Sequence, residues 1–197
     1  ERGKVSKGYE CMGATDDHGL YVRFKPDAEI FETTLFVYDT LKGRLRELAY
    51  LNKGLRISLE DKRAGQEQKD SFCYEGGICS FVEELNKSRD ELLFPTPVYF
   101  EEQDGDTVCE VAIQYNESYN EVIYSYANNV NTIDGGTHVE GLKMALTKVI
   151  NDVGRKHNIL KESDKLSSED VLEGITAVVS VKLVNAQFES QTKAKLN

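Results

Sequence analysis

An alternating apolar segment near the end of the sequence constrains the fold most strongly. Between residues 175 and 183 every second side chain is apolar, and polar side chains occupy most of the positions between them. A period of two is typical of a β-strand that buries one face and exposes the other. The chain then becomes polar and places Gln191 and Lys193, an amide and an ammonium, two residues apart beyond the strand. A rigid strand with such a tip could hold a positive charge at a fixed place next to an anion.

The other periodic segments predict an α+β fold. Apolar residues at helical spacing predict helices over residues 40–53, from residue 76 onward and over residues 137–156, with a short helix ending at Gly174. Alternation and turn dipeptides predict strands over residues 55–59, 71–74, 98–102, 108–115 and 121–126. In this order the helices should cover one face of a mixed sheet.

Cap signals mark the expected helix ends. Thr40 is a candidate N-cap of the first helix, and Gly54 follows its end. Thr137 and Glu140 have the capping-box spacing at the start of the longest helix, and Ser167 precedes the short one. The inner face of the longest helix is predicted to comprise Val139, Leu142, Leu146, Val149, Ile150 and Val153.

The first 36 residues have too few elements for a domain of their own. Residues 19–24 alternate until Pro26 ends the pattern, and they predict one of two short strands joined by a turn. Two strands alone cannot bury a face. We therefore expect residues 1–36 to be the remnant of a larger domain, excised from a longer protein, and residues 37–197 to form a second domain.

The overall charge excludes some classes of site and partner. With 24 basic and 34 acidic residues the net charge is −10, which argues against a protein that coats nucleic acid, because such binding needs clustered cations. The four cysteines contain no C-x-x-C pair and the three histidines are scattered, so zinc-site spacing is absent. We expect buried free thiols in a reducing cytoplasm. No apolar run approaches the roughly 18 residues of a membrane span.

One local basic region stands out against this acidic background. It comprises Lys42, Arg44, Arg46, Lys53, Lys62 and Arg63. A solvated helix face is the simpler interpretation, and a surface over which DNA passes is the sharper one.

A glycine pair precedes the longest predicted helix. Helix N-termini favour anions, but no Lys-Ser/Thr pair follows Gly135-Gly136 as a P-loop requires. We therefore expect the glycines to provide a sharp turn into the helix, and His138 in the first turn to be structural. The sequence contains no complete active site.

Several segments together resemble the B subunits of bacterial DNA gyrase and topoisomerase IV. The matching segment nearest the end is Gln187-Phe188-Glu189-Ser190-Gln191-Thr192-Lys193. The other matching segments are residues 24–31, 44–52, 74–77, 111–116, 128–129 and 135–138. They occur in a single order over nearly the whole chain, so the resemblance is specific.

The resemblance implies an ATP-dependent type II topoisomerase that acts on double-stranded DNA in the cytoplasm. Residues 37–197 would be the transducer domain, with a βαββα-like core and a left-handed crossover, following the end of the ATPase domain. Gln191 and Lys193 would contact the γ-phosphate of ATP, with Lys193 as the catalytic residue. The implied cofactors are ATP and Mg²⁺ in the whole protein. The implied partners are the chain's own ATPase domain, together with the gyrase A protein and another copy of gyrase B in an A2B2 complex.

The resemblance also implies what this chain lacks. The magnesium-binding, general-base and adenine-binding residues would precede residue 1, and the DNA-cleaving tyrosine would belong to the gyrase A protein. We therefore expect the chain alone to bind no cofactor and to be inactive. Three alternatives stay open: a fragment of the corresponding topoisomerase IV protein, an RNA- or protein-binding module of the same fold, and a small-molecule kinase, which the missing phosphate loop disfavours.

Overall fold

The computed structural model describes residues 4–23, 26–89 and 91–197. The chain divides into two units, Glu1–Leu41 and Lys42–Asn197, and each is described by itself. Helix α1 (Tyr38–Leu51) begins in the first unit and continues in the second.

The first unit is irregular before α1. Its described residues up to Val37 form no helix or strand, and the apolar side chains of Tyr9, Leu20 and Tyr21 are exposed. The predicted strand over residues 19–24 is therefore absent from Gly19 to Arg23, and residue 24 lies outside the described residues. A strand needs a neighbour for its backbone N–H and C=O groups, and no partner strand is present in the described part of this unit.

In its described residues, the second unit contains two sheets and three further helices. Its remaining elements are β1 (Ile57–Asp61), β2 (Gln68–Phe72), α2 (Ile78–Asn86), β3 (Val98–Asp104), β4 (Thr107–Tyr115), β5 (Val122–Ala127), β6 (Val130–Asn131), α3 (Thr137–Lys156), α4 (Ser168–Leu172) and β7 (Ile175–Lys182). Strands β1 and β2 form an antiparallel hairpin. The five-stranded sheet has the order β3-β4-β7-β5-β6, and β5 and β7 are its parallel pair. This confirms the predicted α+β fold with a mixed sheet, whereas the handedness of the crossover stays a prediction.

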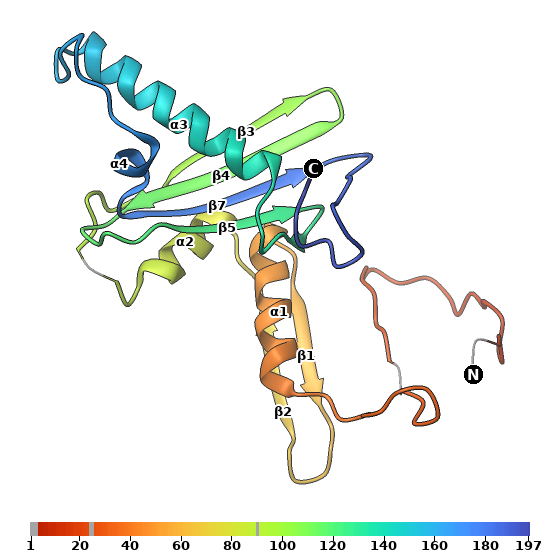
Figure 1. The fold of residues 1–197 in the computed structure, drawn as a ribbon. Coiled ribbons are helices and arrows are strands. Elements are labelled where there is room, and N and C mark those ends of the chain that lie inside the picture. Colours follow the sequence, from red (N-terminus) through yellow and green to blue (C-terminus); the bar gives the residue numbers. More distant parts are fainter. Residues whose placement is uncertain (1–3, 24–25, 90) are drawn as a thin grey trace. The chain divides into compact units, whose positions relative to one another are not determined.

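Helices cover both faces of the five-stranded sheet, so the prediction of one covered face was wrong (Figure 1). Val178 of β7 packs in a cluster with Val82 of α2 and Leu51 of α1. Its neighbour Val179 points the other way, into a cluster with Leu142 of α3. Strand β7 is buried from Ile175 to Val181 because it lies in the middle of the sheet.

A buried polar cluster explains how β7 tolerates a hydroxyl between two layers. The hydroxyl of Thr176 donates to Asn86 Oδ1 of α2 at 2.8 Å, and Asn86 Nδ2 donates to Gln114 Oε1 at 2.8 Å. Asn116 Nδ2 donates to both Asn86 Oδ1 and Thr176 Oγ1 at 3.3 Å. Buried polar groups cost little when they are paired in this way. The alternating pattern predicted a strand with one buried face, whereas β7 is buried on both faces.

The bounds predicted for α3 are correct, but its predicted cap is not. Its N-cap is Gly136, which provides no side-chain cap, because Thr137 is already the first helical residue. At the start of α1, Thr40 likewise lies inside the helix rather than at its N-cap. In contrast, Ser167 caps α4 as expected, and it does so in a capping box with Asp170.

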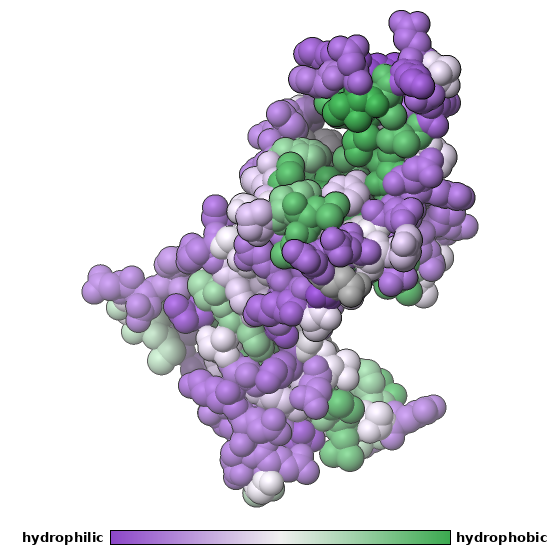
Figure 2. Space-filling model, turned by 90° about the vertical axis from the view of Figure 1, so that its left-hand side faces the viewer, coloured by the Kyte–Doolittle hydropathy of each residue, from purple (hydrophilic) through white to green (hydrophobic). Residues whose placement is uncertain are grey.

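The C-terminal half of α3 leaves part of its apolar stripe uncovered. Val139 and Leu142 are buried as predicted, whereas Val149 and Val153 are 55% and 46% exposed. Figure 2 shows a hydrophobic area among hydrophilic side chains near the top of the view, where α3 lies in Figure 1.

Candidate functional site

The chain after β7 forms a loop, residues 183–197, that turns back to the start of α3 (Figure 1). We call it the C-terminal loop. Leu196 N–H donates to the carbonyl of Gly135 at 3.1 Å, and Thr137 N–H donates to the carbonyl of Leu196 at 3.2 Å. Asp134 N–H donates to the carbonyl of Ala194 at 2.9 Å. The loop therefore satisfies one of the backbone donors that a helix N-terminus leaves unpaired.

Gly136 makes this contact sterically feasible. Its φ is +136°, a conformation that favours glycine, and a Cβ atom built there would lie 2.2 Å from the carbonyl oxygen of Leu196. The glycine pair was predicted to give a sharp turn into the helix. The close approach of Leu196 is a second requirement, which the sequence did not reveal because its partner lies 60 residues away in the chain.

Side chains fix the base of the C-terminal loop to the sheet. Leu196 is 3% exposed and clusters with Ala127 of β5 and Val181 of β7, and Phe188 packs against this cluster. Phe188 and Leu196 also form an antiparallel bridge. Burying a leucine side chain stabilises a fold by roughly 1.5–3 kcal/mol. The base of the loop is therefore part of the core.

The tip of the loop carries the two predicted site residues. Gln191 and Lys193 are exposed, and a turn closed by the Lys193 N–H to Ser190 carbonyl hydrogen bond, 3.1 Å, holds them. Lys193 has a φ of +58°, which is uncommon for a residue with a side chain. Strand β7 ends at Lys182, so these residues sit on an anchored loop and not on the strand tip expected from the sequence.

A polar chain lies beneath the start of α3. The hydroxyl of Ser125 donates to the carbonyl of Thr132 at 2.8 Å, and Thr132 Oγ1 lies 3.1 Å from His138 Nε2. Burial lowers the pKa of His138, so the neutral ring is favoured. These contacts agree with the structural role predicted for His138.

The Asn128-Asn129 turn ties β5 to the end of β7. Both residues have positive φ, 49° and 62°. The side chain of Asn128 pairs with the backbone of Leu183 in both directions at 2.8 Å, donating from Nδ2 and accepting at Oδ1. Asparagine tolerates this backbone conformation, so the dipeptide is a recognisable turn signal. Its contact with the first residue of the C-terminal loop could not be read from the sequence.

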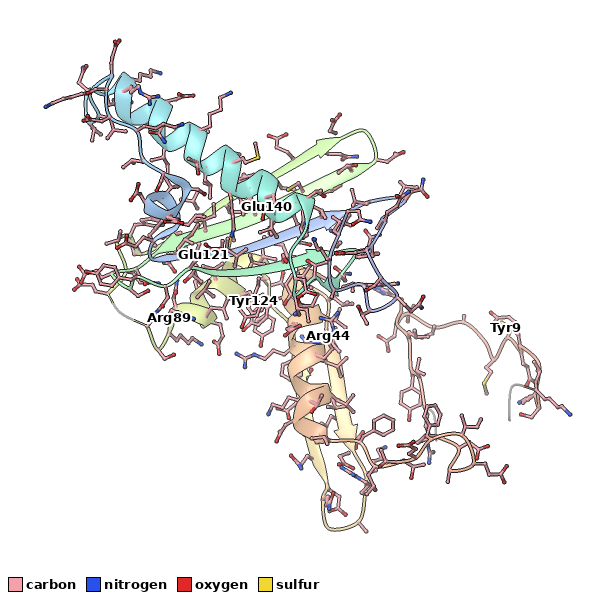
Figure 3. The ribbon with its side chains drawn as sticks, in the orientation of Figure 1. Tyr9, Arg44, Arg89, Glu121, Tyr124 and Glu140 are labelled. Carbon is pink, nitrogen blue, oxygen red and sulfur yellow. The ribbon has the colours of Figure 1, made fainter. Side chains whose placement is uncertain are left out.

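The four predicted DNA-facing basic residues are each paired with a carboxylate. The pairs are Arg44 with Glu47 at 2.8 Å, Arg46 with Glu84, Lys62 with Glu60 at 3.4 Å, and Arg63 with Asp61 at 2.5 Å. Arg44, labelled on α1 in Figure 3, also donates to the carbonyl of Asn129 at 2.6 Å. Local acidic partners therefore offset much of this charge, and a DNA-facing role for these residues stays a prediction.

The cysteines and the metal ligands offer no second site in the described part of the chain. All four cysteines are free; Cys11 is exposed and the other three are half-buried, so the expectation of buried thiols was too strong. Burial raises the pKa of Cys79 and Cys109, which keeps these thiols protonated. Among residues 4–23, 26–89 and 91–197 no cluster of three potential metal ligands occurs. Over the same residues no helix is both long and apolar enough to cross a bilayer.

Known proteins with similar sequences and folds identify the family. The family model described as DNA gyrase B matches residues 77–197. The gyrase B protein of Clostridium acetobutylicum is 55% identical over 197 residues, which are 99% of this chain and 30% of that protein. This chain thus spans about a third of the length of that relative.

Solved structures agree with this assignment. The 43K ATPase domain of Thermus thermophilus gyrase B, in complex with an aminocoumarin, aligns with a TM-score of 0.76 and 37% identity over 88% of this chain and 46% of that one. The topoisomerase IV ATP-binding domain of Francisella tularensis aligns with a TM-score of 0.70 and 26% identity, over 87% and 45%. The family match covers more than half of the chain, and the chain belongs to the DNA gyrase B family.

Proposed function

We propose that this chain is the transducer region of a gyrase B protein, which couples the nucleotide state to closure of the DNA gate and strand passage. The C-terminal loop carries this proposal, because its base is buried and its tip exposes Gln191 and Lys193. A fixed base with an exposed cation and amide is suited to reading the charge of a phosphate bound by another domain. The base of the loop is also hydrogen-bonded to the start of α3, so a movement of the tip on phosphate binding would be passed on to that helix.

The interaction of the Lys193 charge with one phosphate charge would not by itself be strong enough to switch the protein between two states. A pair of unit charges 4 Å apart is worth about 4 kcal/mol at an effective dielectric constant near 20. Shifting a two-state equilibrium from 1:99 to 99:1 needs about 5.5 kcal/mol. Lys193 would therefore be the largest single contributor, with Gln191 and a dimer interface supplying the remainder. ATP has the γ-phosphate and ADP lacks it, so the contact would distinguish the two states.

The residues present fit one phosphate group rather than a whole nucleotide. The Lys193 ammonium has three donors and Gln191 adds a neutral amide donor, which together can hold and orient terminal phosphate oxygens. In the described residues no carboxylate cluster is arranged to hold a magnesium ion. Bound ATP with Mg²⁺ would supply the phosphoryl group and its charge, and the remaining ligands would come from the rest of the full-length protein. The chain alone should therefore not hydrolyse ATP.

The proposal includes the partners of the whole enzyme. They are the ATPase domain of the same protein, another copy of gyrase B, the gyrase A protein and double-stranded DNA in the bacterial cytoplasm. We propose that residues 37–197 belong to the transducer domain, and the family match, which begins at Gly77, supports this for the larger part. Among the four basic residues predicted to face DNA, Lys62 has the most exposed side chain, at 72%.

The decisive experiment replaces Lys193 by alanine in the full-length protein. We expect ATP turnover to fall at least tenfold, while the affinity for a non-hydrolysable ATP analogue changes little. Lys161→Ala, an exposed lysine in another loop, is the matched control and should leave both quantities unchanged. Equal losses of turnover and binding for Lys193→Ala would contradict a signalling role. Magnesium-dependent turnover by the isolated 197-residue chain would contradict its predicted inactivity.

A further inference from the structure

We propose that Phe188 is a positioning residue that holds the Lys193 ammonium ready for an anion. The inference rests on the proposed role of Lys193 as a phosphate contact. Lys193 Nζ lies 5.7 Å from the centroid of the Phe188 ring. The negative face of an aromatic ring attracts a cation at this range, most often within about 6 Å. Phe188 is thus the side chain that supports the charged group at the loop tip.

The Phe188 ring is itself fixed by the core. It is half-buried and packs against the cluster of Ala127, Val181 and Leu196. Its backbone bridges to Leu196, whose own backbone is hydrogen-bonded to Gly135 and Thr137. A lysine on a free loop loses much rotamer freedom when it binds a ligand. A ring packed against the sheet and against Leu196 removes part of that loss before the ligand arrives.

The ring supports the charge without neutralising it. The carboxylate of Glu189, the residue after Phe188, pairs with Lys195 at 3.2 Å and is thereby occupied. Within residues 4–23, 26–89 and 91–197, Lys193 forms no ion pair. An anion that approaches the tip therefore meets an uncompensated positive charge. A carboxylate in place of Phe188 would compete with the phosphate, which an aromatic face does not do.

The backbone of the loop sets the direction in which Lys193 projects. The left-handed conformation of Lys193 is maintained by the turn to Ser190 and by two flanking hydrogen bonds. These are Glu189 N–H to the Lys195 carbonyl at 3.1 Å and Asn197 N–H to the Gln187 carbonyl at 3.0 Å. An uncommon backbone conformation persists only where its surroundings impose it. The turn fixes the direction in which the Lys193 side chain leaves the backbone, and from there its ammonium lies over the Phe188 ring.

The test measures ATP turnover by the full-length protein with three substitutions, two at position 188 and one at position 193. Phe188→Leu keeps an apolar side chain but removes the aromatic face, and should lower kcat about two- to fivefold, the range of an exposed cation–π contact. Phe188→Tyr keeps the face and should leave kcat near the wild-type value. In a Lys193→Gln background, Phe188→Leu should cause no further loss. If Phe188→Leu lowers kcat equally in both backgrounds, the ring only packs, and the positioning role is overturned.

A series of fluorinated phenylalanines at position 188 gives a second, size-matched measurement. Successive fluorines weaken the negative face of the ring with little change of shape, so log kcat should fall steadily at constant melting temperature. If kcat stays constant along the series while Lys193→Gln still slows turnover, the positioning role of Phe188 is overturned but the phosphate contact of Lys193 is not. If Lys193→Gln leaves turnover unchanged, the proposed phosphate contact fails as well.

Discussion

Two irregular stretches of this chain behave differently. In the described residues before α1, large apolar side chains are exposed, with Tyr9 at 101% and Leu20 at 89%. In the C-terminal loop, Leu196 is only 3% exposed and its backbone pairs with the start of α3. Both segments lack long elements of secondary structure. The comparison shows that an irregular segment gains a defined place when its backbone groups and one apolar side chain find partners in the core.

Gly136→Ala should disrupt the attachment of the C-terminal loop and should lower the unfolding free energy more than the other substitutions. The new Cβ would meet the backbone of Leu196 and would also require an unfavourable φ, so we expect a loss of about 3 kcal/mol in unfolding free energy. Chemical denaturation of the isolated chain measures this, and ATP turnover of the full-length protein should fall in parallel.

The matched control for Gly136→Ala lies on the same helix. Gly141 of α3 has no heavy atom within 4 Å of an added Cβ, so Gly141→Ala should stabilise the fold by about 0.5–1 kcal/mol through helix propensity. If both substitutions lowered the unfolding free energy by a similar amount, α3 would be sensitive to any substitution. The loss at Gly136 could then not be attributed to its contact with Leu196.

The same leucine substitution at the two stretches sharpens the comparison directly. Leu196→Ala removes a buried side chain and should cost about 2–3 kcal/mol, whereas Leu20→Ala should change the unfolding free energy by less than about 0.5 kcal/mol. Urea denaturation of both variants is the measurement. Equal effects would mean that the difference in burial between the two stretches does not reflect their stability.

The pH dependence of stability should report on the polar chain beneath α3. Because burial lowers the pKa of His138, the folded state binds this proton more weakly than the unfolded state. The contribution of the neutral His138 ring to the unfolding free energy is complete above pH 6.5, the ordinary pKa of histidine, and is lost as the pH falls from there through the lowered pKa of the folded state. The difference in unfolding free energy between wild type and His138→Asn should therefore shrink on acidification. A difference that is constant from about pH 8 to about pH 5 would contradict the burial of this ring.

The Glu189–Lys195 ion pair should contribute least to the unfolding free energy. Its side chains are 61% and 48% exposed, so Lys195→Ala should cost no more than about 0.5 kcal/mol, and less at high salt. Denaturation at two salt concentrations checks this. A loss close to that of Leu196→Ala would show that the ion pair, and not the buried leucine, anchors the loop.

Much of the fold follows from local patterns in the sequence. The spacing of apolar residues predicts both bounds of α3, and the Ser167 cap predicts the start of α4. The burial of β7 on both faces was missed because Thr176 and Ser180 are polar. A strand's place in the sheet decides whether such residues are buried, and that depends on long-range pairing. The residues before α1 were predicted as strands because their pattern is local, whereas strand formation needs a partner.

The candidate site was only partly predictable. Gln191 and Lys193 were singled out from their place after a strand, and the family resemblance added the γ-phosphate contact, which stays a prediction; the structure shows both side chains exposed. The Leu196–Gly136 contact and the ring of Phe188 beneath Lys193 join residues that no local pattern connects. The basic residues are a mixed case: Glu47 lies one helical turn after Arg44 and Asp61 lies two residues before Arg63, so these partners are local, whereas the Arg46–Glu84 pair joins two helices and depends on the fold.

The most direct test of the account is amide hydrogen exchange of the C-terminal loop in the full-length protein. The amides of Leu196 and Asn197 should be protected in every state, because their partners belong to the fold itself. The amides of residues 190–193 should gain protection with a non-hydrolysable ATP analogue and not with ADP. Equal protection of these tip residues in both nucleotide states would contradict the claim that an anchored loop reads the γ-phosphate.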